Sequence, residues 1–389
     1  MSLIRRDVSA AGLPVVTSPT GSALSSVPIR TSALRQSVIW ASMSLRAATE
    51  SLMPANVYRN TGGVAVEVNK TRFFRAPSSF AEGHDDTFAD WMYAGRMALD
   101  GYGNNFGEVV EQDTFGFPVR IQLVPPEDVR CRISRYRIVE YQFGHTVMNP
   151  RNVWHERQNL IPGVPVGLSP FAYAALTIQT GQAAREFASE WFGNKAVPAA
   201  HLKNTERAIP DDTAAAKIKA RFQETVNAGD VFVTGKDWTY SPLQAKAAES
   251  GLLDAMNWNA LELVRFFNVM PEMVSVGVES GASITYANIT QANLQFLVRH
   301  MARSIKGRED ALTAITPSPQ FVKLTREAFL AMDPLTRAEL IETKVRSRTL
   351  TPDEGRRIDD GMPLSESDYA QFDRLFGNPN KQTPQKGQA

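Results

Sequence analysis

The chain has 389 residues, of which 43% are hydrophobic and 21% charged, so its length predicts two or three folded units with a substantial hydrophobic core. Its 42 lysines and arginines nearly balance 41 acidic residues, which excludes a protein that grips nucleic acid through bulk charge. The single cysteine, Cys131, excludes an internal disulfide and every multi-cysteine metal site.

The N-terminal segment does not look like part of a packed core. Residues 1–36 are dominated by Ser, Thr, Pro, Gly and Ala, and we expect them to form an arm that is either flexible or ordered by a partner. Arg5 and Arg6 are not followed by the apolar block of a secretory signal peptide. No run in the chain approaches ~18 apolar residues, so no transmembrane helix and no membrane partner are expected.

Helices and antiparallel strands are predicted for the next part of the chain. Helical spacing of apolar residues predicts packing helices from Ser37 to Leu52 and from Asp86 to Asp100. Alternating apolar and polar residues predict strands around them, with a hairpin turn at Gly62-Gly63 and several strands between Phe106 and Val153. The arginines of residues 130–137 give the last strands one basic face, either solvated or in contact with nucleic acid.

The stretch from Asn152 to Asn194 carries the strongest local signal in the chain. Ser169 and Pro170 are typical N-cap and first-turn residues. The proline-free stretch after them suffices for a helix of roughly 35 Å. Small residues such as Ala174 and Gly181 let helix backbones approach closely, so we expect packing against other helices, either in the same chain or in further copies of it.

Two further long helices and an insert follow. A small α+β insert is predicted for residues 199–245, and a second long helix from Ala245 to Asn268. After Pro271, the Gly- and Ser-rich loop Gly277–Asn288 has the composition of a mobile segment. The third long helix is predicted from Thr290 to Leu312. Its polar faces carry the densest basic cluster of the chain, which comprises Arg299, His300, Arg303, Lys306 and Arg308.

The C-terminal part is predicted to contain short helices. A strand at Phe321–Leu324 precedes a helix that starts at Asp333-Pro334. Thr351 and Glu354 have the spacing of a capping box and predict another helix. Residues from Asn378 onward are polar and are expected to be disordered.

The catalytic and metal-binding patterns that the sequence approaches each fail at a defined residue. His155-Glu156 begins like a zinc-protease helix, but Asn159 occupies the position of the second histidine. Ser169 lies in a segment, GLSPF, that lacks the closing glycine of a nucleophile elbow. We therefore expect no enzyme, no metal and no cofactor.

Several segments between Ser37 and Pro363 stand in a distinctive order and spacing. They read SLMPANVYR, GEVVEQDTFGFPVRIQLVPPEDV, NVWHER, GLSPFAYAA, EFASEWFGNKAVPAAHL, GDVFVTGKDWTYSPL, LELVRFFNVMPEMV, SGASITYANI and RTLTPDEGRRIDDGMPL. Together they resemble the portal proteins of tailed bacteriophages, in particular the shorter type of long-tailed phages. One departure is FNVMP at residues 267–271, where members of that family often carry Phe-Gly-Val-Pro-Pro.

This resemblance implies an α+β portal fold. It has a β-rich wing, two long stem helices that bracket a small α+β clip, a long wing helix and a short helical crown. The implied ranges are an arm (1–36), the wing (37–167), stem helix 1 (168–193), the clip (194–244), stem helix 2 (245–270), the tunnel loop (271–288), the second part of the wing (289–330), the crown (331–377) and a disordered tail (378–389).

The resemblance also implies a function and partners. Copies of the chain would form a ring, twelve-fold as is usual in the assembled head, at one capsid vertex of a virion assembled in the host cytoplasm. Double-stranded DNA would pass through this channel without sequence specificity during packaging and ejection. The implied protein partners are the large terminase, the head-tail adaptor, and the major capsid and scaffolding proteins.

Four sets of residues follow from these implied roles. The tunnel-loop residues expected to face DNA are Gly277, Glu279, Ser280, Gly281, Ser283, Thr285 and Tyr286. The cations expected to guide the duplex, with subunit–subunit ion pairs as the alternative, are Arg299, Arg303 and Lys306. The stem residues expected to pack subunits together are Ala174, Ile178, Gly181, Phe187, Trp191, Leu253, Met256, Val264 and Phe267. The clip residues expected to dock partners are Lys203, Lys217, Lys219, Arg221, Lys236 and Trp238.

Two other classes of protein remain open. The chain could be an adaptor or minor capsid protein that binds one partner as a monomer, and a ring in solution would separate that class from a portal. A less well supported class is a hydrolase with His155 and Glu156 as acid and base. That class needs a second ionisable cluster nearby, and none is evident in the sequence.

Overall fold

The computed structural model divides the chain into two units, residues 1–326 and residues 327–389. The described residues are 6–9, 33–134, 136–193, 200–204, 238–242, 246–276, 286–326, 334–358 and 361–376, with isolated helical positions between 213 and 224. Their mixture of helices and antiparallel strands confirms the predicted α+β class. The names wing, stem, clip, tunnel loop and crown are kept below for the residue ranges given above.

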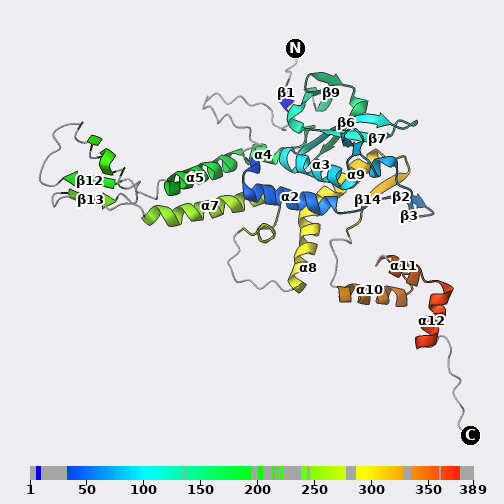
Figure 1. Ribbon diagram of the computed structural model, residues 1–389. Helices are drawn as coiled ribbons and strands as arrows, with labels where there is room; N and C mark the ends of the chain where they lie inside the picture. The colour runs from blue at the N-terminus through cyan, green and yellow to red at the C-terminus, as the bar shows by residue number, and fades with distance from the viewer. Residues whose placement is uncertain are drawn as a thin grey trace, which may run out of the picture. The chain divides into compact units, whose positions relative to one another are not determined.

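Two helices of the wing, α2 (Ser37–Ser51) and α3 (Phe88–Tyr102), pack against each other (Figure 1). They coincide closely with the two predicted helices. Thr87 caps α3 by accepting a hydrogen bond from a backbone N–H of its first turn. Gly103 ends α3 in the left-handed region, at φ 70°, and a Cβ there would lie 2.1 Å from the Leu168 carbonyl oxygen. Only glycine fits this position.

Three antiparallel sheets complete the wing. Gly62 and Gly63 form the predicted hairpin turn, with φ of 60° and 84°. A small two-stranded ribbon, β4 (Ser79–Ala81) and β5 (His84–Asp85), precedes α3. In sheet order, the strands of the three sheets are β11 (Val153–Arg157), β6 (Asn104–Gln112) and β7 (Pro118–Val124); β1 (Arg6–Ser9), β8 (Val129–Ser134), β9 (Arg137–Phe143) and β10 (Thr146–Met148); and β14 (Gln320–Leu324), β2 (Ala55–Thr61) and β3 (Val64–Val68).

The arm contains one strand, which the sequence does not predict. Strand β1 pairs antiparallel with β8 and places Val8 opposite Cys131. The prediction of a flexible arm is therefore wrong for Arg6–Ser9, because the edge of a wing sheet supplies backbone partners that the composition of the arm cannot reveal. Residues 10–32 lie outside the described part of the chain.

The predicted first stem helix is divided into two. Helix α4 (Pro170–Tyr173) and helix α5 (Ala175–Gly193) are separated at Ala174. Ser169 caps α4, as predicted, by accepting a hydrogen bond from the Ala172 N–H at 3.3 Å. Helix α5 runs beside the second stem helix, α7 (Lys246–Phe266) (Figure 1).

Polar side chains tie the stem helices together within the chain. The Asn259 amide donates to the Thr177 carbonyl at 2.8 Å. It lies over Gly181, where a Cβ would come within 2.4 Å of Asn259 Oδ1. Gln36, just before α2, donates to the Ile178 carbonyl at 2.7 Å. These bonds join α2, α5 and α7.

Several stem residues predicted to pack subunits together instead pack inside the chain. Four of them are at most 3% exposed, namely Ala174, Ile178, Val264 and Phe267. Gly181 faces Asn259 of the same chain. The spacing of small and apolar residues marks a helix–helix contact but does not say whether the second helix belongs to the same chain. Phe187 is 48% exposed, Met256 is partly buried, and the side chains of Trp191 and Leu253 lie outside the described residues.

The clip contains a two-stranded ribbon. Strand β12 (Ala200–Asn204) pairs antiparallel with β13 (Trp238–Pro242). The described positions between 213 and 224 are helical, in agreement with the predicted helix of the insert. The other predicted hairpin strand, residues 231–233, lies outside the described residues.

The third long helix contains a change of helical geometry. It consists of α8 (Tyr286–Gln295), a π-helical turn (Phe296–Met301) and α9 (Ala302–Ala314). A 3₁₀ turn, Pro271–Val274, follows the end of α7. The π-helical turn is not predicted by the spacing of the apolar residues.

In its described residues, 334–358 and 361–376, the second unit contains three helices, α10 (Pro334–Arg346), α11 (Pro352–Ile358) and α12 (Glu366–Phe376). The predicted capping box is present before α11. Glu354 accepts a hydrogen bond from the Thr351 N–H at 2.8 Å, and Thr351 Oγ1 accepts one from the Glu354 N–H at 3.3 Å. The predicted tail, residues 378–389, lies outside the described residues.

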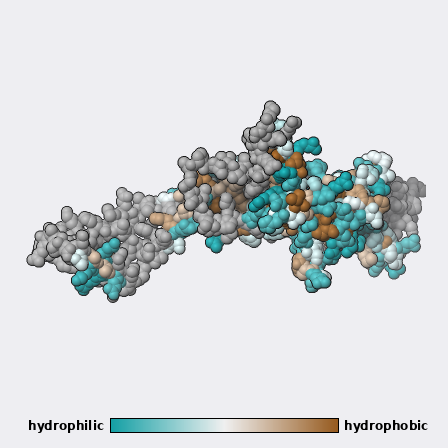
Figure 2. All heavy atoms as spheres, turned by 90° about the horizontal axis from the view of Figure 1, so that it is seen from above, coloured by the Kyte–Doolittle hydropathy of each residue, from teal (hydrophilic) through white to brown (hydrophobic). Residues whose placement is uncertain are grey.

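Hydrophilic residues cover most of the described surface on the face shown in Figure 2, with apolar side chains scattered among them. Among the residues that the structure describes, no helix has the length and apolar character needed to cross a membrane.

The contact at Gly181 can be tested by substitution. Gly181→Ala is expected to lower the free energy of unfolding by roughly 0–2 kcal/mol, because a cost of about 1–3 kcal/mol where the added Cβ meets Asn259 is offset in part by the gain of about 0.5–1 kcal/mol that alanine brings to a helix. The matched control is Gly251→Ala on α7, where nothing lies within 4 Å of an added Cβ. That control is expected to stabilise the protein by about 0.5–1 kcal/mol, since alanine is the better helix former. Urea unfolding of the purified variants measures both, and equal effects would contradict the close stem contact.

Candidate functional site at a buried charge junction

Six charged side chains meet inside the wing, and we call this cluster the charge junction. Each is at most 5% exposed. They come from four elements that lie far apart in the sequence. The members are Arg46 and Glu50 of α2, Arg96 and Asp100 of α3, Glu156 of β11 and Arg308 of α9.

Glu50 lies at the centre of the charge junction. One of its carboxylate oxygens accepts from Arg96 Nε at 2.7 Å, and the other accepts from Arg308 Nε at 2.8 Å. Arg308 also donates through Nη1 to Glu156 at 2.6 Å. The guanidinium carbon of Arg308 lies 5.8 Å from the ring centre of Trp91, a cation–π contact.

Asp100 links Arg46 to the rest of the charge junction. Its carboxylate accepts from Arg46 Nε at 2.9 Å and from the Gln158 side-chain amide at 3.2 Å. Gln158 also accepts a hydrogen bond from Arg96. The Gln158 amide therefore connects the Arg46–Asp100 pair to the group around Glu50, because it accepts from Arg96 and donates to Asp100.

The electrostatics of the junction follow from its balance of three guanidinium groups and three carboxylates. Burial alone would lower the pKa of Arg96, but the carboxylates of Glu50, Asp100 and Glu156 outweigh burial and raise it. Burial raises the pKa of Glu156, and the guanidinium groups of Arg308 and Arg96 oppose this rise. Each charge is thus tolerated in the interior only because its partners are present.

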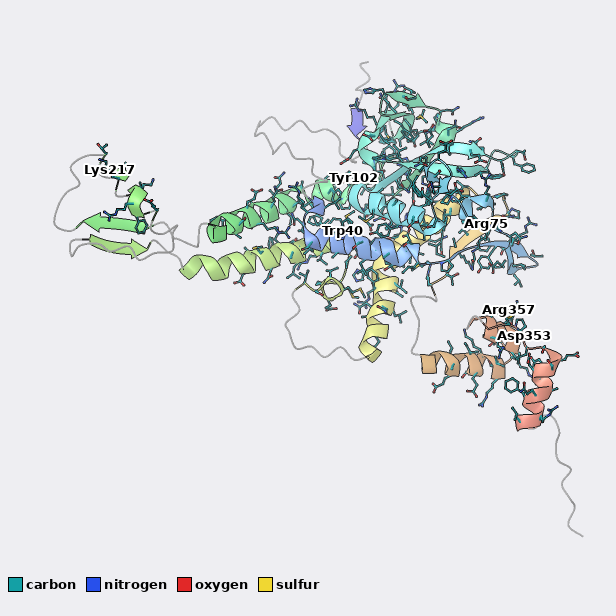
Figure 3. All side chains as sticks on the ribbon, viewed as in Figure 1. Trp40, Arg75, Tyr102, Lys217, Asp353 and Arg357 are labelled. Atoms are coloured by element: carbon teal, nitrogen blue, oxygen red, sulfur yellow. The ribbon has the colours of Figure 1, made fainter. Side chains whose placement is uncertain are left out.

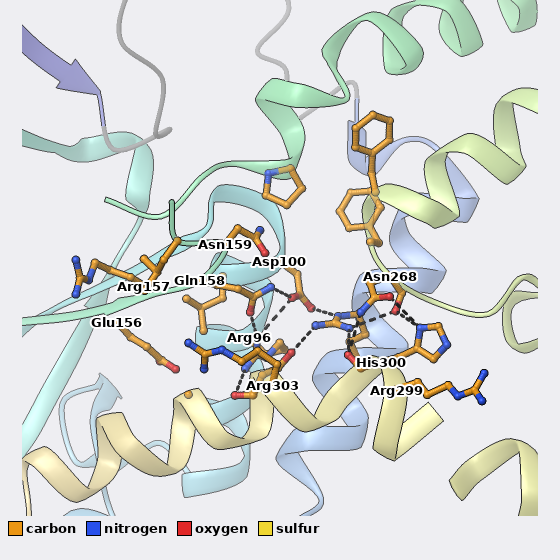
Figure 4. Close-up of a pocket in the computed structure, with 18 residues that line it drawn as sticks. Arg96, Asp100, Glu156, Arg157, Gln158, Asn159, Asn268, Arg299, His300 and Arg303 are labelled. Carbon is orange, nitrogen blue, oxygen red and sulfur yellow. Dashed lines mark hydrogen bonds and ion pairs between the residues drawn. The ribbon is translucent and has the colours of Figure 1, made fainter. Parts of the chain in front are cut away.

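A pocket of about 250 Å³ opens beside the charge junction (Figure 4). Four members of the junction line it, namely Arg46, Arg96, Asp100 and Glu156. Residues near the two ends of the segment that contains the tunnel loop also line it, namely Phe266, Phe267, Asn268, Arg299, His300, Arg303, Ser304 and Gly307. The remaining lining residues are Leu99, Arg157, Gln158, Asn159, Leu160 and Pro170.

Most of the predicted tunnel-loop residues cannot be placed. Gly277, Glu279, Ser280, Gly281, Ser283 and Thr285 lie outside the described residues. Tyr286 is the first residue of α8, and its side chain is likewise outside the described part.

The predicted guiding cations occupy different surroundings. Arg299 and Arg303 are exposed and line the pocket, and Lys306 pairs with Asp310 at 2.5 Å, both side chains being 61% exposed. Arg308, which the sequence groups with these exposed residues, is instead fully buried. Arg308 shares the helical face of Met301, Ile305 and Leu312, all of which are fully buried, whereas Arg303 lies on the polar face. Helical spacing therefore carries a signal for the burial of Arg308, but it does not identify the carboxylates that pair with it.

The clip residues predicted to dock partners lie on several elements. Lys217, Lys219 and Arg221 are exposed on the described helical positions of the insert, and Lys217 is labelled in Figure 3. Lys203 lies in β12 and Trp238 in β13, of which the backbone alone is described. Lys236 lies outside the described residues.

His155 and Glu156 do not form an acid–base pair. They are neighbours on β11, so their side chains project from opposite faces of the strand. Glu156 pairs with Arg308, whereas His155 lies between the Tyr141 hydroxyl and Asn104, at 3.0 and 3.1 Å, and stacks on Phe106. Burial, with help from Arg157, lowers the pKa of His155 to about 3. The hydrolase alternative therefore has no support from this geometry.

No group of three His, Cys, Asp or Glu side chains among the described residues is arranged to hold a metal ion. The charge junction itself is absent from the sequence predictions. A signal for it exists on α2, because Arg46 and Glu50 fall on the same helical face as Met43 and Ala47. Charged residues within an apolar stripe indicate buried ion pairs.

The arrangement of wing, paired stem helices and clip can be compared with known proteins. The family model described as phage portal protein matches residues 37–360. The chain belongs to this family. The probable portal protein of Streptomyces phage phiC31 is 24% identical over 351 residues, covering 85% of this chain and 76% of that protein. This family is structural rather than enzymatic.

Solved structures show the same fold. The crystal structure of a phage portal protein of the HK97 family from Corynebacterium diphtheriae aligns with a TM-score of 0.58 at 15% identity, covering 79% of this chain and all of that chain. A chain from the neck of a native gene transfer agent particle, computed with C12 symmetry, aligns with a TM-score of 0.56 at 17% identity, covering 87% of this chain and 93% of that chain. The portal fold inferred from the sequence is confirmed.

The central role of Glu50 predicts a large loss of stability on substitution. Glu50→Gln keeps the shape of the side chain but leaves Arg96 and Arg308 without their shared carboxylate, so the free energy of unfolding is expected to fall by about 3–5 kcal/mol. Asp310→Asn, which removes one partner of an exposed pair on α9, is expected to cost about 0–1 kcal/mol. Urea unfolding followed by tryptophan fluorescence compares them, and similar losses would contradict a buried network.

The lowered pKa of His155 predicts acid sensitivity. Below the ordinary value of 6.5 the unfolded chain takes up a proton that folded His155 does not accept until about pH 3. Stability is therefore full above pH 6.5 and falls between these two values, by up to about 1.4 kcal/mol per pH unit. His155→Gln should make urea unfolding less dependent on pH, whereas His84→Gln, at an exposed position, should not. An unchanged slope in His155→Gln would exclude this origin.

Proposed function

We propose that this chain forms a ring at one vertex of a phage capsid, through which double-stranded DNA enters during packaging and leaves during ejection. The observation that carries this proposal is the portal family match over residues 37–360, which spans the wing and both stem helices. Neck structures of a gene transfer agent computed with C12 and C6 symmetry contain chains of the same fold. They support a symmetric ring, and we propose a dodecamer.

A sleeve for DNA has to let the duplex slide in both directions. Many phosphate contacts would act as a brake, because each releases counterions and strengthens binding. The formal net charge of +1 suits this requirement. Three arginines of the wing, Arg46, Arg96 and Arg308, are buried and paired inside the charge junction, so their charges are not presented at the surface.

A few spaced cations would centre the duplex without gripping it. Arg299 and Arg303 are exposed and fit this role, whereas the charge of Lys306 is partly offset by Asp310. We assign Gly277–Tyr286 of the tunnel loop to the channel surface on the family resemblance alone. Subunit–subunit ion pairs are the alternative role for the arginines.

The partners follow from the same proposal. The clip, with Lys217, Lys219 and Arg221 exposed, is the proposed docking site for the large terminase and afterwards for the head-tail adaptor. The major capsid and scaffolding proteins are the proposed partners during assembly in the host cytoplasm, and the finished protein is placed at the portal vertex of the virion. No sequence-specific contact with DNA and no catalytic role is proposed.

Electron microscopy of the purified chain tests the assembly, and a DNA-packaging assay tests the passage of DNA. We expect rings with a central channel. In Arg299→Ala/Arg303→Ala the rings should still form, but DNA packaging should be slower, by roughly threefold or more, because the guiding charge is removed. Lys306→Ala is the matched control and should have a smaller effect. A purified chain that stays monomeric at high concentration would contradict the ring, and normal packaging by the double variant would exclude these arginines as guides.

A further inference from the structure

The segment between Asn268 and His300, which contains the tunnel loop, begins and ends at one point of the wing. Asn268 follows α7 and adopts the left-handed conformation, with φ 52°. His300 lies in the π-helical turn between α8 and α9. In Figure 4 the two side chains lie against each other at the edge of the pocket.

Asn268 and His300 bind each other reciprocally. The Asn268 side-chain amide donates to the His300 carbonyl at 3.3 Å. His300 Nδ1 in turn lies 3.1 Å from the Asn268 carbonyl and 3.0 Å from its side-chain oxygen, and both of these oxygens accept. Each side chain is therefore bonded to the backbone of the other residue, and the two ends of the segment are joined directly.

Arg46 joins both ends to the body of the wing. Its Nη1 donates to the His300 carbonyl at 3.2 Å and to the Asn268 carbonyl at 3.5 Å. Its Nη2 donates to Ser304 Oγ at 2.8 Å, and its Nε to Asp100 at 2.9 Å. The side chain of Arg46 is 3% exposed, and its bonds to the two carbonyls and to Ser304 are partly buried at the wall of the pocket.

The acceptors of these bonds distinguish Arg46 from the other arginines of the charge junction. Arg308 donates to carboxylates, and Arg96 donates to carboxylates, to the side chain of Gln158 and, at 3.5 Å, to the Ser304 carbonyl. Neither of them contacts both ends of the segment in the described part of the chain. Arg46 instead donates through one guanidinium nitrogen, Nη1, to the carbonyls at both ends of the segment. A lysine could keep the ion pair with Asp100, but it lacks the planar fork that serves several acceptors at once.

We propose that Arg46 is a positioning residue for residues 269–299, a clasp that holds both ends of this segment against the wing. Because one guanidinium holds both carbonyls, the two ends are fixed and released together. The clasp is a property of the single chain. Its consequence for DNA rests on the proposed function: there, Arg46 sets how the tunnel loop enters the channel.

Hydrogen exchange of the purified full chain without DNA tests the clasp, using the variants Arg46→Lys and Arg46→Gln. Hydrogen bonds to a buried charged group resist local opening, so their loss should speed exchange in peptides covering residues 264–270 and 298–304 by about tenfold or more. Both peptides should change together, in both variants. In Arg46→Lys the peptides of α3 should keep the protection of the unsubstituted chain, and Asp310→Asn should change none of these peptides.

Three outcomes would overturn the proposal. Arg46→Lys could behave like the unsubstituted chain, which would mean that a positive charge beside Asp100 is sufficient. One of the two peptides could change without the other. Exchange could also rise equally throughout the wing, including α3, which would reduce Arg46 to a general stabilising residue.

A second variant keeps the test decisive where the Arg46 variants do not fold. Asn268→Gly suits the left-handed backbone but removes the side-chain bond to His300. Arg46 can still donate to both carbonyls in this variant, so the same two peptides should keep the protection of the unsubstituted chain. A joint rise of about tenfold would assign the hold on the two ends to the Asn268 side chain and overturn the role of Arg46. Since exchange is read from the chain alone, a failure of the clasp is distinct from a failure to form rings or to package DNA.

Discussion

The wing depends on the balance of charge inside it. Three guanidinium groups and three carboxylates meet where α2, α3, β11 and α9 converge. Taking an ion out of water costs several kcal/mol, and good geometry with every partner in place is needed to offset that cost. The junction therefore ties the four elements to one another, because none of them can shift without leaving a charge unpaired in the interior.

The same balance bears on how a neutral chain could serve as a sleeve for DNA. Three buried arginines of the wing face buried carboxylates, while exposed cations such as Lys306 and Arg132 pair with Asp310 and Glu140. Exposed pairs contribute little stability, yet they lower the positive potential of the surface. A sequence with many arginines can thus remain weakly attractive to phosphate, which is what sliding requires.

The helices and strands of the wing and stem could be predicted because their signals are local. Ser169 caps its helix, Gly62-Gly63 turns a hairpin, and Thr351 with Glu354 forms the capping box. The junction depends on contacts between distant segments, and the spacing of the apolar residues marks neither the interruption at Ala174 nor the π-helical turn. Arg308 illustrates the limit. It shares the helical face of Ile305 and Leu312, which indicates burial, but the spacing does not identify its partners, Glu50 and Glu156.

Asn268 gives a physical reason for the departure at residues 267–271 from the Phe-Gly-Val-Pro-Pro pattern. The position requires a positive φ, which glycine adopts freely and which asparagine tolerates better than most residues. Glycine would satisfy the backbone but could not donate to the His300 carbonyl. Asparagine accepts some conformational cost and adds a side-chain bond across the two ends of the segment. The departure thus falls at the residue where the chain holds its tunnel loop, and the bond to His300 accounts for the choice of side chain.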